Sequence, residues 1–355
     1  MDISVLTQLN AQSNGVHCTI SVLVSRDLHE DILISCSDLK TLKVIPKGFP
    51  TEICRAIEAK DIQDELINAY TDVISDELNP IPMQTGKNMH ISLIDKCKPF
   101  KITTSRRVPL RFEKEANKVV QDLIEKKVIV PVKETTEWCS PAFFVPKADG
   151  IKMRLVTDYT QLNKFVKRPV HPFPSTRDIL QSIPKEAKIF AKLDAVHGYF
   201  QLALDEKSSI ITTFLLPQGK FRYLGAPMGL NASSDEWCCH SDAIIEGFPW
   251  ARKIVDDTLI WADNIDTLQQ RIRLVLDRCR DFNVTISKKK FQIGERMEFA
   301  GHMISSTGIR PDDKKYDAIK NFPRPTDIKS LRAFCGLAVQ LGSFIPDLSH
   351  MLARM

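Results

Sequence analysis

Two adjacent aspartates interrupt a run of apolar, β-favouring residues and limit how this part of the chain can fold. Asp256 and Asp257 lie within residues 253–261, whose sequence is KIVDDTLIW. Strand-forming residues on both sides of a short acidic pair predict a strand, an acidic turn and a second strand. Adjacent carboxylates repel each other, and burying them is costly unless a cation compensates their charge. The hairpin therefore predicts a metal site at the end of a buried sheet.

An aspartate pair alone is weak evidence, because a chain of this length contains about one such pair by chance. A second pair, Asp312 and Asp313, lies between Pro311 and Lys314. Its polar surroundings predict an ordinary solvated loop. The pair in the hairpin differs because apolar strands flank it.

A third acid strengthens the prediction of a metal site. Asp194 ends residues 188–194, whose sequence KIFAKLD predicts a strand. The elements between Asp194 and the aspartate pair can bring both strand ends together in one sheet. Carboxylates on neighbouring strands can hold two Mg²⁺ ions roughly 3.5–4 Å apart, as in two-metal phosphoryl transfer. Mg²⁺ takes many of its ligands from substrate phosphates, so a sparse set of protein ligands is expected.

The composition indicates a globular protein. The 355 residues suffice for two or three domains, and 43% apolar with 26% charged residues is ordinary. No apolar run reaches the roughly 18 residues of a membrane span. The first residues, MDIS, lack the pattern of a secretory signal. Nine cysteines without a framework suggest free thiols, so we expect an intracellular protein, in a cytoplasmic particle or the nucleus.

The net charge of +5 is mild, but the basic residues gather in two stretches. One is residues 271–290, with Arg271, Arg273, Arg278, Arg280, Lys288, Lys289 and Lys290. The other is residues 98–111, with Lys98, Lys101, Arg106, Arg107 and Arg111. Each stretch alone is typical of a solvated surface. Together they suit a polyanion that is held while metal ions act on it.

Periodicity predicts the elements around these residues. Helices are expected over residues 53–70, 231–245 and 263–282. A further amphipathic helix would bury Ala116, Val119, Val120, Leu123 and Ile124. Residues 210–215 and 221–224 predict a hairpin, and short β-like runs occur at residues 19–24 and 31–35.

Five motifs, in this order along the chain, resemble those of retroelement reverse transcriptases. The fingers motif is KADG at 147–150, followed by RLVTDY at 154–159 and LN at 162–163. KLDAVHGYFQ at 192–201 resembles the first catalytic motif, and APMGL at 226–230 resembles the Pro-Phe-Gly-Leu loop. IVDD at 254–257 resembles the Tyr-x-Asp-Asp box, and FAGH at 299–302 resembles the primer-grip hairpin. The order and spacing are similar to the gypsy-type class of LTR retrotransposon polyproteins, from about residue 60 onward.

The resemblance implies an α+β, right-hand polymerase fold with fingers and a palm, whose antiparallel sheet is backed by helices. The fingers are expected at about residues 101–170 and 203–232, and the palm at about 171–202 and 233–300. Residues 49–100 would be a linker with a helix, and residues 301–355 the start of an incomplete thumb or connection. Residues 1–48 resemble the tail of a retropepsin-like protease that lacks the Asp-Thr-Gly motif. The resemblance ends there, so the RNase H and integrase segments of a polyprotein are not expected within these residues.

The resemblance also implies site residues. Asp194, Asp256 and Asp257 would be the catalytic residues and the metal site, with Asp257 in a supporting role. Two Mg²⁺ ions are expected, with Mn²⁺ as a substitute. The dNTP would contact Lys147, Arg154, Tyr199, Met228 and Gly229. The primer grip would be Phe299, Ala300, Gly301 and His302.

Several of these positions have a specific expected role. Arg154 and Lys147 would hold the triphosphate, as basic groups near phosphate charge should. Tyr199 would pack under the sugar and reject a 2′-hydroxyl. Lys290 lies near the family's late lysine, which helps to protonate pyrophosphate. Ile254 replaces the usual Tyr.

The implied function is template-directed DNA synthesis: nucleotidyl transfer from a dNTP to a primer 3′-hydroxyl on an RNA or DNA template. A catalytically silent fragment that only binds nucleic acid, or a structural remnant, are the alternatives. The three acids favour the polymerase, whereas an incomplete thumb favours the silent fragment. Trp237 is expected to pack where the family has Phe. Cys238, Cys239 and His240 are consecutive on a helix and cannot all reach one ion, so packing is expected there.

Overall fold

The structure is a computed structural model of the chain. It describes residues 3–13, 16–25, 33–34, 51–79, 83, 88–146, 152–345 and 347–353. The chain divides into two compact units, residues 1–62 and 63–355. The first unit holds an antiparallel sheet in the order β1 (Ile3–Ser13), β2 (Val16–Ser25), β3 (Leu33–Ile34). Helix α2 (Thr51–Ala69) begins in the first unit and ends in the second, close to the helix expected over 53–70.

A four-stranded antiparallel sheet lies at the centre of the second unit. Its order is β10 (Ala251–Ile254), β11 (Asp257–Ala262), β7 (Ile189–Asp194), β12 (Gln292–Gly294). The predicted strand over 188–194 and the acidic hairpin are both present. The β11–β7 ladder runs from Asp257 opposite Asp194 to Ala262 opposite Ile189. This register brings the acidic ends of both strands to one edge of the sheet.

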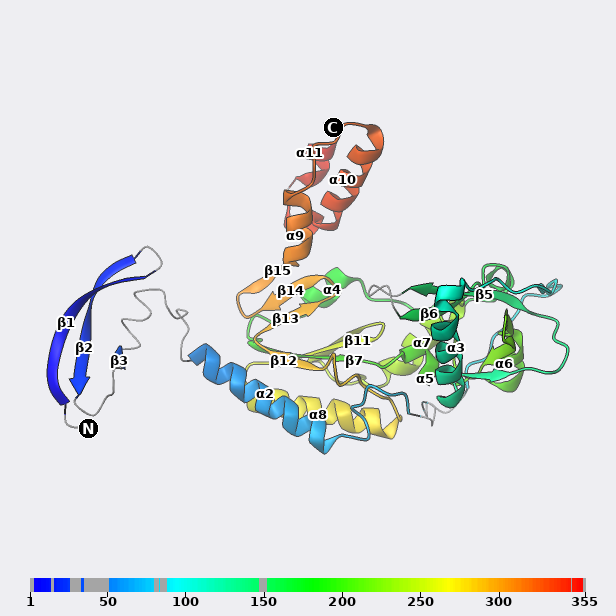
Figure 1. The fold of residues 1–355 in the computed structure, drawn as a ribbon, viewed down its shortest axis with the longest axis horizontal. Coiled ribbons are helices and arrows are strands. Elements are labelled where there is room, and N and C mark those ends of the chain that lie inside the picture. Colours follow the sequence, from blue (N-terminus) through cyan, green and yellow to red (C-terminus); the bar gives the residue numbers. More distant parts are fainter. Residues whose placement is uncertain are drawn as a thin grey trace. The chain divides into compact units, whose positions relative to one another are not determined.

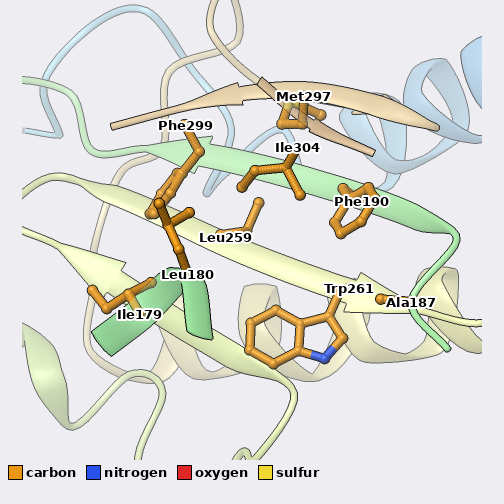
Figure 2. Close-up of a cluster of buried hydrophobic side chains, with 9 residues drawn as sticks. All are labelled: Ile179, Leu180, Ala187, Phe190, Leu259, Trp261, Met297, Phe299 and Ile304. Carbon is orange, nitrogen blue, oxygen red and sulfur yellow. The ribbon is translucent and has the colours of Figure 1, made fainter. Parts of the chain in front are cut away.

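Both faces of this central sheet are covered. Helix α8 (Ile265–Asp281) lies along one face (Figure 1) and buries Leu268, Ile272, Val275, Leu276 and Cys279, the face that the helical period predicts. The other face packs on a second sheet, β13 (Arg296–Phe299), β14 (His302–Ser305), β15 (Gly308–Pro311). Between the two sheets, Phe190, Leu259 and Trp261 pack with Met297, Phe299 and Ile304 (Figure 2).

A five-stranded sheet forms the rest of the layered structure. Its order is β4 (Ile129–Pro131), β9 (Gly219–Tyr223), β8 (Phe214–Leu216), β5 (Ser140–Pro146), β6 (Met153–Thr157). β8 and β9 form the predicted hairpin, but its first strand is shorter than expected. Residues 206–211 form helix α6 (Glu206–Ile211) instead. The cause is local, because the side chain of Asp205 caps the helix by accepting a hydrogen bond from the Ser208 amide.

The remaining elements are mostly helical. They are α3 (Leu110–Glu125), η1 (Leu162–Lys164), α4 (Thr176–Gln181), α5 (Gly198–Gln201), α7 (Asn231–Asp242), α9 (Asp313–Lys320), α10 (Ile328–Gln340), η2 (Gly342–Phe344) and α11 (Leu348–Leu352). The predicted solvated loop at Asp312 is wrong: Asp312 caps α9 and accepts from the Lys314 amide. Among the described residues, no helix is long and apolar enough to cross a membrane.

The layer between the two sheets should be the part of the second unit most sensitive to truncation. Phe190→Ala removes a fully buried ring and leaves a cavity, so the free energy of unfolding should fall by about 3–5 kcal/mol. Leu274→Ala on the exposed side of α8, where Leu274 is 50% exposed, should change it by about 0.5 kcal/mol at most. Urea unfolding followed by tryptophan fluorescence compares the two variants. Equal losses would contradict this account of the core.

Candidate active site

The β7–β11 ladder brings the three predicted acids together. Asp194 ends β7 and lies directly opposite Asp257, the first residue of β11. Asp256 occupies the turn, preceded by Val255 in the left-handed conformation at φ 52°. The Ala195 amide donates to the Asp256 carbonyl at 3.1 Å, which ties this turn to the end of β7. The carboxylates therefore converge because of strand register and one strained turn.

The site is electrostatically crowded. Burial raises the pKa of Asp256 to about 6, and repulsion from Asp194 and Asp257 adds to that effect. Burial also raises the pKa of Asp257, with a further contribution from its hydrogen bond to Asp194. Among the described residues, the Oδ1 atoms of Asp256 and Asp257 are buried without a hydrogen-bond partner. Buried carboxylate oxygens without partners are costly, and they are suitable ligands for a hard divalent cation.

Lysine side chains compensate the acids in this conformation. The Nζ atom of Lys290 lies 2.9 Å from both carboxylate oxygens of Asp194. The Nζ atom of Lys192 lies 3.5 Å from Asp257 Oδ2. Within the described ranges, no three His, Cys, Asp or Glu side chains already surround a common ion position. The donor set fits a divalent cation, provided that Lys290 withdraws from Asp194.

The underside of the acidic hairpin is tightly packed. A Cβ atom on Gly198 would lie 2.3 Å from Asp256 Oδ1 and 2.7 Å from the Trp237 ring. The indole of Trp237 donates to the Val255 carbonyl at 3.2 Å. Trp237 thus has the packing position expected of it, and it also holds the strained turn. Gly198 lies in a motif that the sequence identifies, but its contact with Asp256 requires the fold.

The predicted dNTP residues are only partly brought together. Arg154 and Met228 line a cavity of about 270 Å³ together with His197 and Phe200. Gly229 follows Met228 in the left-handed region at φ 86°. Tyr199 does not line this cavity. It is half-buried, and burial, followed by repulsion from Asp256, raises its pKa to about 12.

Lys147 is the remaining residue predicted to contact the dNTP. Lys147 lies outside the described residues. A larger cavity, about 430 Å³, is lined by Trp250, Trp261 and Arg271 at the other end of β11 and contains none of the three acids. The smaller cavity is not lined by the acids either, but it does contain the predicted dNTP residues Arg154 and Met228.

The predicted primer-grip residues form the turn between β13 and β14. Phe299 is fully buried and pairs with His302 across the turn. Ala300 and Gly301 both have positive φ values, 50° and 72°, which a tight two-residue turn requires. Lys192 donates to the Glu298 carbonyl at 3.4 Å as well as approaching Asp257. One lysine thus bridges the acidic site and this hairpin.

The acids of α7 have structural partners that the sequence does not reveal. Asp235 is almost fully buried and accepts two hydrogen bonds from Arg168, at 2.6 and 3.3 Å. Asp242 accepts from His171 at 2.8 Å and pairs with the buried Lys253 at 2.9 Å. These pairs fasten residues 168–171 onto the helix that supports the acidic hairpin. Their partners are too distant in sequence for local patterns to find.

Of the consecutive residues Cys238, Cys239 and His240, Cys238 has the packing role expected from helix geometry. Cys238 is buried, and burial raises the pKa of its thiol to about 11. Cys239 is exposed. His240 lies 3.5 Å from Glu236 one turn away. The three side chains point to different surroundings.

The basic stretch 271–290 is largely occupied by the protein itself. Arg280 makes a bidentate pair with Asp72 at 2.5 and 2.8 Å, and Arg273 pairs with Glu65 at 2.6 Å. Arg278 donates to the backbone carbonyls of Ala243 and Glu246. Most arginines of this stretch thus have partners within the protein, and the suggestion that the stretch binds a polyanion stays a prediction.

The basic stretch 98–111 differs from the stretch 271–290 in the partners of its side chains. Arg106 and Arg111 lie over the rings of Phe143 and Phe112, at 4.7 and 4.4 Å. Within the part of the chain that the structure describes, no basic residue of this stretch makes an ion pair.

The similarity to a known protein family lies in the segment that contains this site. Residues 145–304 match the family described as reverse transcriptase (RNA-dependent DNA polymerase). The chain contains a reverse transcriptase domain. The domain spans the three acids and the β13–β14 turn. The match rests on the segment whose motifs the sequence places in order.

Relatives by sequence are polyproteins. The retrovirus-related Pol polyprotein from transposon 412 of Drosophila melanogaster is 29% identical over 325 residues, covering 88% of this chain and 25% of that protein. The one from transposon 297 is 30% identical over 263 residues, covering 71% and 24%. The enzymatic polyprotein of cauliflower mosaic virus is 29% identical over 284 residues, covering 77% and 41%. The chain thus spans about a quarter to two fifths of these relatives.

Solved structures share the fold. A foamy viral protease-reverse transcriptase in complex with double-stranded DNA matches with a TM-score of 0.70 and 19% identity, covering 98% of this chain and 63% of that one. The same kind of protein in complex with an RNA/DNA hybrid matches with a TM-score of 0.68 and 18% identity, covering 99% and 49%. The predicted α+β polymerase fold, with its antiparallel sheet backed by helices, is confirmed.

The raised pKa of Asp256 makes a prediction about stability. Its folded value of about 6 exceeds the usual 3.8, so folding takes up a proton between these values. Stability contributed by this group is therefore present at low pH and lost as pH rises from about 4 to 6. Asp256→Asn should raise the free energy of unfolding at pH 7.5 by about 1–2 kcal/mol, after allowance for solvent screening.

This gain should disappear toward pH 4, where wild-type Asp256 is protonated in both states. Urea unfolding at a series of pH values with EDTA measures the difference. Asp317→Asn, an exposed acid on α9, is the control and should show no such trend. A constant or opposite difference for Asp256→Asn would refute the raised pKa.

Proposed function

We propose that this chain catalyses template-directed DNA synthesis, transferring a nucleotide from a dNTP to a primer 3′-hydroxyl on an RNA or DNA template. The observation that carries the proposal is the convergence of Asp194, Asp256 and Asp257 at one sheet edge, within a reverse transcriptase domain. Relatives that are Pol polyproteins, and structural neighbours solved with double-stranded DNA or an RNA/DNA hybrid, support the substrate class.

Asp194 and Asp256 would hold two divalent ions, Mg²⁺ or Mn²⁺, with Asp257 supporting them. The unpartnered oxygens of Asp256 and Asp257 favour this assignment. When bound, such ions lower the pKa of an attacking hydroxyl and neutralise charge on transferring phosphate. The carboxylates must be ionised to bind these ions, and a bound cation would oppose the effect of burial and of the neighbouring acids, which raise the pKa of Asp256.

The protein's own side chains would position the reacting groups. Arg154 and Lys147 would pair with the triphosphate, and Met228 and Gly229 would border it. The primer 3′-oxygen forms a bond to the α-phosphorus as the bond to pyrophosphate breaks. Lys290, already beside Asp194, would donate a proton to the departing pyrophosphate once it has left the carboxylate. The β13–β14 turn, Phe299 to His302, would hold the primer end.

The domain assignments belong to the same proposal. The five-stranded sheet and α3 correspond to the fingers, residues 101–170 and 203–232. The central sheet with α8 corresponds to the palm, residues 171–202 and 233–300. We also infer a gypsy-type LTR element as the source and a protease remnant for residues 1–48. The polyprotein names of the relatives, and foamy viral protease-reverse transcriptases that align with almost the whole chain, support both points.

Primer extension tests the proposal directly. Asp256→Asn removes an ionised ligand, so deoxynucleotide incorporation with Mg²⁺ should fall by about 10³-fold or more on RNA and DNA templates. Asp313→Asn changes the second aspartate pair, at the surface of α9, and should leave incorporation unchanged. Equal incorporation by wild type and Asp256→Asn would reject the proposal. Salt-sensitive template binding without incorporation would identify a silent nucleic-acid-binding protein instead.

The sugar specificity gives a second test. Tyr199 is half-buried beside Asp256, where its ring can exclude a 2′-hydroxyl. Tyr199→Val should raise the ratio of ribonucleotide to deoxynucleotide incorporation by about 10-fold or more, since the excluding ring is gone. Tyr316→Val on exposed α9 is the control. An unchanged ratio would remove Tyr199 from the sugar site.

A further inference from the structure

A segment outside the reverse transcriptase match is joined to the back of the acidic site. This segment, residues 63–76, consists of the end of α2 and the turns that follow, and we call it the brace. It lies in the second unit, whereas the family match begins at residue 145. Arg273 and Arg280 of α8 anchor it through Glu65 and Asp72. None of the roles assigned above uses the brace.

The brace extends the backbone pairing of the central sheet. The Ser75 amide donates to the Ile286 carbonyl at 2.9 Å, and the Ile286 amide donates to Val73 at 2.8 Å. Ile286 also forms an antiparallel bridge with Ala195, the residue after Asp194. The segment at Ile286 therefore lies between residues 73–75 and the end of β7. A displacement of the brace would be transmitted through a single intervening segment.

That intervening segment continues into a turn that carries Lys290. We call residues 287–291 the lysine turn. The Ser287 amide donates to the Asp194 carbonyl at 2.7 Å, and the Phe291 amide closes the turn on the Ser287 carbonyl at 3.0 Å. Lys290 leaves this turn to reach the Asp194 carboxylate. The turn therefore fixes both the backbone of Asp194 and the cation beside it.

The brace holds both ends of the lysine turn through side chains. Asp76 Oδ1 accepts from the Ser287 hydroxyl at 3.1 Å and from the Lys289 amide at 3.0 Å. Its Oδ2 lies 3.5 Å from Lys289 Nζ. At the other end of the lysine turn, the side-chain amide of Gln63 donates to the Phe291 carbonyl at 3.0 Å. Asp76 also lines the cavity that contains Arg154.

We propose that Asp76 is a positioning residue of the active site, which acts by fixing the lysine turn so that Lys290 extends into the acidic site, where it contacts Asp194 in this structure and would reach the pyrophosphate in the reaction. The inference rests on the proposed function. The side chain of Lys290 is 63% exposed, so the surroundings of the ammonium group do not hold it in place. Its position depends on the backbone from which it extends. Asp76 contacts this backbone at the Lys289 amide, one residue before Lys290.

Three variants separate this role from general stabilisation. Asp76→Ala removes the contacts of the Asp76 side chain to the lysine turn and leaves the contact of Gln63 to Phe291. Asp76→Asn keeps a carbonyl oxygen that can accept from Ser287 and the Lys289 amide. Asp72→Ala is the matched control, because it breaks the pair with Arg280 that anchors the same brace to α8, away from the lysine turn.

Two measurements on the full chain are made for each variant. Pre-steady-state primer extension separates the fraction of active enzyme, from the burst amplitude, from the rate constant per active site. Amide hydrogen exchange of the peptide covering residues 284–292 reports the order of the lysine turn without requiring activity. Asp76→Ala should lower the rate constant about 10-fold at unchanged amplitude and accelerate exchange. Asp76→Asn and Asp72→Ala should stay within about 3-fold of wild type in rate constant.

Each of the other possible outcomes contradicts a specific part of the proposal. Equal effects of Asp76→Ala and Asp72→Ala, or a loss of amplitude alone, would show a purely structural role. Accelerated exchange with an unchanged rate constant would show that the turn does not position Lys290 for the reaction. Unchanged exchange would show that Asp76 does not fix the turn. If wild type itself incorporates nothing, the proposed function fails, while the exchange result still decides whether Asp76 fixes the turn.

Discussion

The crowding of three carboxylates at the end of the β7–β11 ladder is the constraint on which the rest of the structure depends. Burial and mutual repulsion raise the pKa of Asp256 and Asp257, so the arrangement opposes folding at neutral pH. It persists because both faces of the sheet are covered. A slip of β11 by one residue against β7 would turn Leu259 and Trp261 out of the core. Apolar packing thus maintains an unfavourable arrangement of charge.

Lysines from different elements offset this negative charge, and they differ in how deeply their side chains are buried. Lys253 on β10 has a side chain only 5% exposed, bound to Asp242 and Ser241, so it is a fixed part of the hairpin's support. Lys290 has a side chain 63% exposed, and among the residues that the structure describes its ammonium group is bound to Asp194 alone. An exposed ion pair is weak and exchanges readily. Under the proposed function, Lys290 can therefore leave Asp194 for a phosphate, whereas Lys253 cannot.

The sequence predicts local structure and the identity of the site, because both depend on short-range patterns. The buried face of α8, the strand ending at Asp194 and the acidic hairpin all follow from periodicity of a few residues. Two local errors, at Asp205 and Asp312, arise because each aspartate is a helix cap. The pairs Arg168–Asp235 and Asp76–Ser287 could not be predicted, since only the tertiary fold brings such distant residues together.

The basic stretch 271–290 shows how the fold reassigns a charge pattern. Arg280 uses Nε and Nη2 in its pair with Asp72, and its Nη1 atom lies 3.5 Å from Asp277 Oδ1, so both edges of its guanidinium group face carboxylates. Arg273 pairs with Glu65, so nucleic acid that bound these two arginines would compete with the acids of the brace. Arg106 and Arg111 lie over phenylalanine rings, which leave the charge uncommitted. Under the proposed function, the contact with nucleic acid therefore belongs to residues 98–111, whereas Arg273 and Arg280 serve the architecture that holds Asp194.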